Sequence, residues 1–257
     1  MGKSSLFSSF LRVINALNEI ASTIIKWSME DDRQNIKTAF RAIAGKPGII
    51  VAIDGTYVPI KAPRENPESY INRKCFHGIT LQAICQPNLM FTDCFTGYPS
   101  SVSDIRIFRN SDIYNSILSH FNTYFNEDEY VIGDKAYPTL NWCIPPFIER
   151  GRLTREQIRF NTIHAKTRQV IERAFALLFG RFRRLRYVDM NRVDLIPSTI
   201  IAACTLHNLC LMQPDALLAE YVQEVLAMGN NPDNIDNEDG LQDGDARRNY
   251  LLDIINN

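Results

Sequence analysis

The sequence predicts an α/β fold in which helices flank a mixed β-sheet, and three observations lead to this expectation. The run from Ile49 to Ile53 is apolar and mostly β-branched, which is typical of a buried strand. Further segments of strand character are separated by segments with helical periodicity. A chain of 257 residues with 45% hydrophobic content can enclose one sizeable core. We therefore expect one main domain with small accessory segments at its ends.

The N-terminal region is expected to be helical. Apolar residues recur at helical spacing through the first 25 positions, so an amphipathic helix should end near Trp27. Charged residues such as Arg12 and Glu19 interrupt this stretch before the ~20 apolar residues that a membrane span requires. We therefore predict no membrane association. A second helix should cover 31–44, because a glycine and a proline follow it.

The main domain should contain strands and helices in turn. Strands are expected at 48–60, 76–85, 89–95 and 130–132. Helices are expected at 104–120, 155–184 and 198–212, the last apolar all round and buried, and 140–147 should be irregular. We divide the chain into a helical region 1–47, the main domain 48–212 and an acidic, partly disordered tail 213–257. Within the tail, 229–245 is rich in Asn, Asp and Gly and is expected to be disordered.

The charge of the chain differs between regions, although the total is only −1. Residues 150–192 carry twelve Lys and Arg against three Asp and Glu, a net charge of +9. From Gln213 onward, the chain has ten acidic residues and two arginines, a net charge of −8. A basic segment of this density is expected of a protein that binds nucleic acid. The six cysteines form no CxxC pair and follow no secretory signal, which predicts reduced thiols.

Acidic side chains lie where strand ends and a helix face can converge. Asp54 follows the apolar run of the first strand, Asp134 follows the fourth strand, and Glu172 lies on the long helix after it. Asp104, where a helix follows the third strand, is a fourth candidate. Phosphodiester hydrolysis uses hard divalent cations that activate water and stabilise charge on phosphate, and these cations prefer carboxylate ligands. The pattern predicts a site for Mg²⁺ or Mn²⁺.

Each of these residues taken alone has a simpler interpretation. An aspartate after a strand is most often a turn former, and a glutamate beside arginines is most often a solvated charge on a helix. Asp104 is either the N-cap of its helix or a metal ligand, depending on whether its side chain points at Asp54. Cys204, His207 and Cys210 lie three residues apart, and buried thiols with a core histidine explain them better than a zinc site with three ligands.

Several strings of the sequence together resemble one family. They are AIDGTYVPIKAP, SYINRK, GYPSSVSDIRIF, GDKAYP, RQVIERAFALLFGRFRRL and CTLHNLC, in this order. Over roughly residues 3–211 the chain is similar to the PIF/Harbinger superfamily of DDE transposases and to the nuclease domesticated from it. The resemblance implies an RNase H-like fold, an acidic triad at Asp54, Asp134 and Glu172, and a further acidic position at Asp104. It also implies that the N-terminal helical region is a remnant of a longer, helix-turn-helix-like region.

The site and the resemblance together predict a divalent-metal-dependent DNA endonuclease, with strand transfer as a further reaction of the same centre. The four acidic residues would hold the cations. The side chains expected to bind DNA phosphates are Arg168, Arg181, Arg183, Arg184 and Arg186. The resemblance also implies a Myb-like DNA-binding partner and a nuclear location, and it leaves a cytoplasmic fraction and homo-oligomers open. The alternative is a catalytically silent domesticated transposase that acts as a DNA-binding or protein-interaction module.

Overall fold

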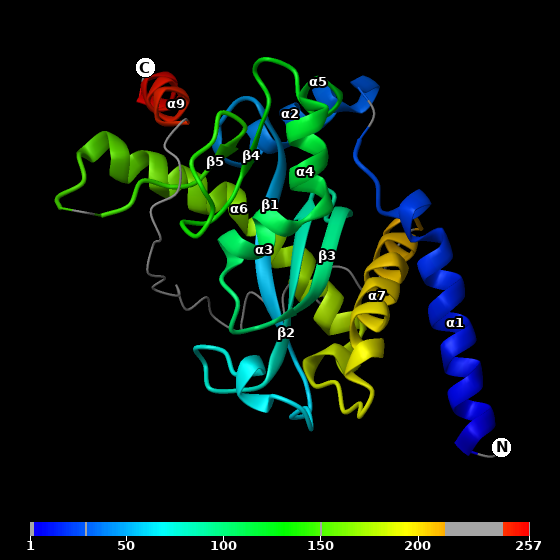
Figure 1. Cartoon of the computed structure of the whole chain (residues 1–257). Helices are drawn as coiled ribbons and strands as arrows, with labels where there is room; N and C mark the ends of the chain where they lie inside the picture. Colours follow the sequence, from blue (N-terminus) through cyan, green and yellow to red (C-terminus); the bar gives the residue numbers. More distant parts are fainter. Residues whose placement is uncertain (1–2, 29, 150, 214–243, 257) are drawn as a thin grey trace.

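The computed structural model describes residues 3–28, 30–149, 151–213 and 244–256. Its centre is one mixed sheet in the order β3-β2-β1-β4-β5 (Figure 1). The strands are β1 (Ile49–Pro59), β2 (Gly78–Cys85), β3 (Phe91–Pro99), β4 (Tyr130–Ile132) and β5 (Cys143–Ile144). The first three form an antiparallel meander, whereas β4 runs parallel to β1 and β5 runs parallel to β4. The α/β fold with a mixed sheet is confirmed, and it is consistent with an RNase H-like fold.

Helices cover both faces of the sheet. They are α1 (Lys3–Ile24), α2 (Glu30–Ala44), α3 (Asp104–Asn110), α4 (Asp112–Ser119), α5 (Phe121–Tyr124), α6 (Arg155–Arg181), α7 (Ile196–Leu211) and α9 (Asp245–Asn256). In Figure 1, α3 and α4 lie in front of the sheet, and α6 passes behind it. Helix α6 contacts β1 and β2, and α7 contacts β3. The core therefore lies on both sides of β1, whose first five residues are buried.

Three elements differ from the sequence prediction. The helix expected at 104–120 is broken at Ser111, whose hydroxyl accepts a hydrogen bond from the backbone N–H of Tyr114 and so starts a new helix. The stretch expected to be irregular contains β5, because Cys143 pairs with Val131. Strand β3 continues to Pro99, beyond the expected end, because Pro99 pairs with Ile79 across a register shift.

Helix α1 packs against α7, which joins the N-terminal region to the main domain (Figure 1). The Asn18 side chain donates a hydrogen bond of 2.9 Å to the carbonyl oxygen of Ser198. Within the described residues, Val193–Leu211 is the one helical segment long and apolar enough to cross a membrane by length and composition, and 44% of it is buried. Its contacts with α1 and β3 are those of a core helix.

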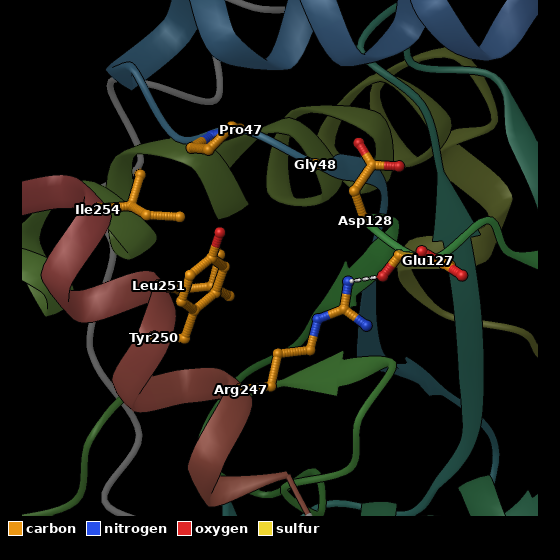
Figure 2. A pocket seen from close by; sticks show the side chains of 8 residues that line it. All are labelled: Pro47, Gly48, Glu127, Asp128, Arg247, Tyr250, Leu251 and Ile254. Atoms are coloured by element: carbon orange, nitrogen blue, oxygen red, sulfur yellow. Dashed lines mark hydrogen bonds between the residues drawn. The ribbon is translucent and has the colours of Figure 1, made fainter.

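Helix α9, which belongs to the predicted acidic tail, packs against α6. Leu251 is buried against the core, and the Arg247 guanidinium donates a hydrogen bond of 2.9 Å to the carbonyl oxygen of Glu127 (Figure 2). Figure 2 shows the cleft of about 500 Å³ that α9 forms with Pro47, Gly48 and the loop before β4. The expected disorder of 229–245 falls almost wholly outside the described residues.

A buried ion pair fastens α2 to the loop before β4. The Arg33 guanidinium lies 3.1 Å from the Glu129 carboxylate, and these side chains are 7% and 0% exposed. Arg33 also donates a hydrogen bond of 2.8 Å to the carbonyl oxygen of Thr123. The neighbouring pair between Lys37 and Asp128 lies at the surface, with the Asp128 side chain 66% exposed. Removing one partner of a buried pair leaves an uncompensated charge, whereas a surface pair contributes little.

We therefore expect Glu129→Ala to lower the free energy of unfolding by about 3 kcal/mol or more. The matched change Asp128→Ala should cost less than about 1 kcal/mol. Urea unfolding followed by circular dichroism measures both. Equal losses in the two variants would contradict the role of the buried pair.

Candidate active site

The parallel pairing of β1 and β4 brings Asp54 and Asp134 together. Ala52 pairs with Ile132, and continuing this register by two residues sets Asp134 beside Asp54. Asp54 lies in the middle of β1 rather than at its end, but the strand is fully buried up to Ile53 and only partly buried from Asp54 to Tyr57. The backbone N–H of Ala136 donates a hydrogen bond of 2.8 Å to the Asp134 carboxylate, which fixes its orientation.

Helix α6 places Glu172 close to Asp54, and Arg168 on the same helix contacts both carboxylates. The Arg168 guanidinium lies 2.5 Å from an Asp54 carboxylate oxygen and 2.6 Å from a Glu172 carboxylate oxygen. Arg168 and Glu172 are four residues apart on α6 and so share one face of the helix. Because one guanidinium contacts both carboxylates, the strand aspartate and the helix glutamate converge on one point. This convergence is what the sequence pattern anticipated.

Asp104 belongs to the same group of carboxylates. Gly55, directly after Asp54, has so little room above it that an added Cβ would lie 2.7 Å from an Asp104 carboxylate oxygen. The negative charge of Asp104 also raises the pKa of Asp54. The N-cap interpretation of Asp104 is wrong, because Ser103 occupies the N-cap position and Asp104 is the first helical residue. We call Asp54, Asp104, Asp134 and Glu172 the carboxylate cluster.

Tyr137 is a member of the site that the sequence analysis missed. It is 3% exposed, and its hydroxyl has no hydrogen-bond partner within the described residues. Burial, together with the charges of Asp104, Asp54 and Asp134, raises its pKa well above the ordinary value. An added Cβ at Gly133 would lie 2.9 Å from the Tyr137 ring, so the glycine before Asp134 makes room for it. The sequence signal that could have identified Tyr137 is its position, three residues after Asp134.

The cluster is electrostatically strained. The pKa of Asp54 is raised to about 8, mainly by burial and also by the charges of Asp134 and Asp104, while Arg168 acts in the opposite direction. Burial likewise raises the pKa of Asp134, against the hydrogen bond from Ala136. For Arg168, burial lowers the pKa, but Asp54 and Glu172 outweigh it and the net shift is upward. The site therefore favours an added positive charge.

The donor atoms of the cluster suit a hard divalent cation, since Mg²⁺ and Mn²⁺ prefer carboxylate oxygens. Within the described residues, no three Asp, Glu, His or Cys side chains already surround a point where an ion would sit. Arg168 instead lies between Asp54 and Glu172. The chemistry of the residues fits a cation, and its entry between these two carboxylates requires Arg168 to move.

The predicted DNA-binding arginines divide into two groups. Arg168 is engaged with the carboxylate cluster. Arg183, Arg184 and Arg186 lie exposed on the 3₁₀ turn Arg183–Arg186, and Arg181 is partly buried at the end of α6. At a helical rise of 1.5 Å per residue, Arg181 lies about 14 Å along α6 from Glu172. The contact of these arginines with DNA phosphates stays a prediction.

Of the three residues weighed as a zinc site, Cys204 and His207 are buried and Cys210 is half-buried. A His207 ring nitrogen lies 2.9 Å from the carbonyl oxygen of Leu89. Burial lowers the pKa of His207 to about 4, which keeps its ring neutral. The interpretation as buried thiols and a core histidine agrees with these contacts.

The fold and the site define a class of protein. The sequence profile described as DDE superfamily endonuclease matches residues 53–208, which is more than half of the chain. The chain belongs to this family. The matched range contains all four members of the carboxylate cluster.

Several of the relatives are named as nucleases. A Mus musculus protein named "Putative nuclease HARBI1" is 30% identical over 215 residues, covering 82% of this chain and 60% of the relative. Its Rattus norvegicus counterpart is 31% identical over 218 residues, with the same coverage. The Arabidopsis thaliana protein named "Protein ALP1-like" is 28% identical over 234 residues, covering 85% of this chain and 56% of the relative. The chain thus spans about 60% of the length of such relatives. No solved structure matches the chain.

The family match and these relatives confirm the resemblance to harbinger-derived nucleases that the sequence motifs indicated.

The raised pKa of Asp54 predicts how stability depends on pH in the metal-free protein. A carboxyl with a pKa of 3.8 when unfolded and about 8 when folded destabilises the fold progressively as pH rises between these values. In EDTA, the thermal midpoint of the wild type should therefore fall more steeply from pH 5 to pH 8 than that of Asp54→Asn. The exposed control Asp189→Asn should follow the wild type. Parallel curves for the wild type and Asp54→Asn would contradict the assignment.

Proposed function

We propose that the chain is a divalent-metal-dependent DNA endonuclease whose reaction centre is the carboxylate cluster. The observation that carries this is the convergence of Asp54 and Glu172 on one guanidinium, with Asp134 and Asp104 beside them. Membership in a family of endonucleases supports the reaction class. Four acidic groups sharing one partly buried site are costly for stability, and such an arrangement is typical of sites that serve chemistry.

The residues have distinct roles in this proposal. Asp54 and Asp134, held by adjacent strands, provide rigid oxygen ligands, and Glu172 approaches from α6 to complete the site. Bound Mg²⁺ or Mn²⁺ would supply an activated water and stabilise the charge on the scissile phosphate. Asp104 contributes a fourth carboxylate from α3. Arg168, once released from Asp54 and Glu172, is positioned to hold a phosphate oxygen next to the reacting bond.

The wider setting of the protein also belongs to the proposal. The +9 charge of residues 150–192 supports DNA as the substrate, with contacts mainly to the backbone. The same centre would activate a 3′-hydroxyl for strand transfer. We further propose a nuclear location and a Myb-like DNA-binding protein as the partner that selects the target.

One observation favours the second candidate, a catalytically silent member of the family that retains the fold for binding. Arg168 fills the space between Asp54 and Glu172, as a permanent structural cation would. In that case the carboxylates serve stability, and divalent cations would have no place to bind.

Nicking of supercoiled plasmid in Mg²⁺ or Mn²⁺ tests the proposed activity. Asp134→Asn should lower the rate at least about 100-fold, because it removes a ligand whose charge stabilisation is worth several kcal/mol. The matched control Asp189→Asn, a change at a half-exposed surface aspartate, should cleave like the wild type. Cleavage by both the wild type and Asp134→Asn at equal rates, or by neither, would refute the proposal.

Replacement of Arg168 separates the two candidates. In EDTA, Arg168→Gln should lose about 2 kcal/mol, a fall of roughly 4–8 °C in Tm, because two carboxylates lose their charged partner. If the cation competes with Arg168, Mn²⁺ should raise the Tm of Arg168→Gln more than that of the wild type. If Mn²⁺ shifts neither midpoint, the silent candidate is favoured.

A further inference from the structure

A second feature lies on α3, the helix whose first residue is Asp104. It is a cleft of about 740 Å³ between the loop after β3 and helix α3. Its lining is mostly polar, with two arginines, two serines and an asparagine. These residues are Ser101, Ser103, Arg106, Arg109 and Asn110. We call this feature the α3 cleft.

The α3 cleft and the carboxylate cluster share one helix. Ser103 and Ile105, which line the cleft, are the neighbours of Asp104 in the sequence. The Asp104 carboxylate faces Gly55 and so lies next to Asp54. Arg106 and Arg109 are three residues apart and are therefore neighbours on the helix surface, with Cβ atoms about 5–6 Å apart. Helix α3 thus presents an acid to the reaction centre and two guanidinium groups to the cleft.

The helix is held firmly on its inner side. Ile107 and Phe108 are 0% and 1% exposed and pack in the core, and Phe108 contacts the ring of Tyr137. The loop is fixed as well, because the Ser101 hydroxyl donates a hydrogen bond to the carbonyl oxygen of Ser69. The positions of the two arginines along the cleft are therefore set by the fold.

Unlike Ser101, the arginines and the Ser103 hydroxyl of the cleft are not engaged in ion pairs or helix capping within the described residues. Arg106 and Arg109 are exposed, and neither forms an ion pair within the described part of the chain. Ser103 is the N-cap of α3, yet its hydroxyl makes no capping hydrogen bond. A serine at this position normally satisfies an N–H of its own helix. Here its hydroxyl remains available to a ligand.

We infer that the α3 cleft binds the sugar–phosphate backbone of DNA next to the phosphate that is cleaved. This inference rests on the proposed function. Guanidinium groups bind phosphate oxygens through paired hydrogen bonds, and serine hydroxyls are frequent phosphate contacts. Arg106 and Arg109 lie on the same short helix as Asp104, on its exposed side, so a strand whose scissile phosphate lies at the carboxylate cluster would continue across α3 to these two guanidinium groups. Recognition of this kind is independent of base sequence.

Binding of a fluorescein-labelled DNA duplex of arbitrary sequence, measured by anisotropy in EDTA, tests the inference without any cleavage. The variant Arg106→Ala with Arg109→Ala should bind at least about tenfold more weakly than the wild type, and the slope of log K against log salt should fall by about 1.8, since each phosphate contact contributes about 0.9. The control Arg12→Ala with Arg41→Ala removes the same charge from exposed positions on α1 and α2 and should change affinity less than about twofold.

Several outcomes would overturn the inference. Equal weakening in both double variants would show that only total charge matters. Wild-type affinity in the Arg106/Arg109 variant, with an unchanged Tm, would show that the cleft does not touch DNA. If the wild type binds a polyglutamate peptide, and the Arg106/Arg109 variant loses that binding but keeps its DNA affinity, the cleft belongs to an acidic protein partner instead.

The inference and the proposed function can fail separately. A wild type that does not nick DNA, but whose affinity depends on Arg106 and Arg109, would refute the activity alone. An active nuclease whose Arg106/Arg109 variant binds and cleaves like the wild type would refute the cleft alone.

Discussion

Carboxylates can share one partly buried site only if positive charge stands among them, and this constraint governs the centre of the molecule. The parallel pairing of β1 with β4 places Asp54 beside Asp134, and α6 adds Glu172. Arg168 supplies the compensating charge between a strand and a helix. Even with Arg168 in place, the pKa values of both aspartates are raised, so full ionisation of the cluster weakens the fold. A cation bound at this centre would take over the same electrostatic role.

The rest of the fold keeps the members of this centre in place. Strand β1 is buried on both faces before Asp54, and Ile107 and Phe108 anchor α3. The ion pair of Arg33 with Glu129 fixes the loop that leads into β4, the strand that ends two residues before Asp134. Glycines next to the acidic residues leave room for other side chains of the centre. Gly55 admits the Asp104 carboxylate, and Gly133 admits the Tyr137 ring, at distances that a Cβ would obstruct.

Much of this architecture could be predicted from local patterns. Apolar runs locate β1, β2 and β4, and helical periodicity locates α6 and α7. The convergence of Asp54 and Asp134 follows from their positions after two buried runs. Long-range contacts could not be predicted in this way. The contact of Arg168 with Asp54 and the docking of α9 depend on neighbours distant in the sequence, and a single sequence carries no signal for them. The break at Ser111 is local, and its signal was a serine in an N-cap position.

The break at Ser111 has a mechanical consequence for the molecule. It separates α3 from α4, and the loop that ends at Ser103 bounds α3 on its other side, so α3 is a short rigid unit between two joints. Asp104 and the two outward-facing guanidinium groups belong to that unit. Because Ile107 and Phe108 hold this unit in the core, one helix fixes the spacing between the Asp104 carboxylate and the two guanidinium groups. A DNA strand bound at both places would therefore meet these charges at a preset separation.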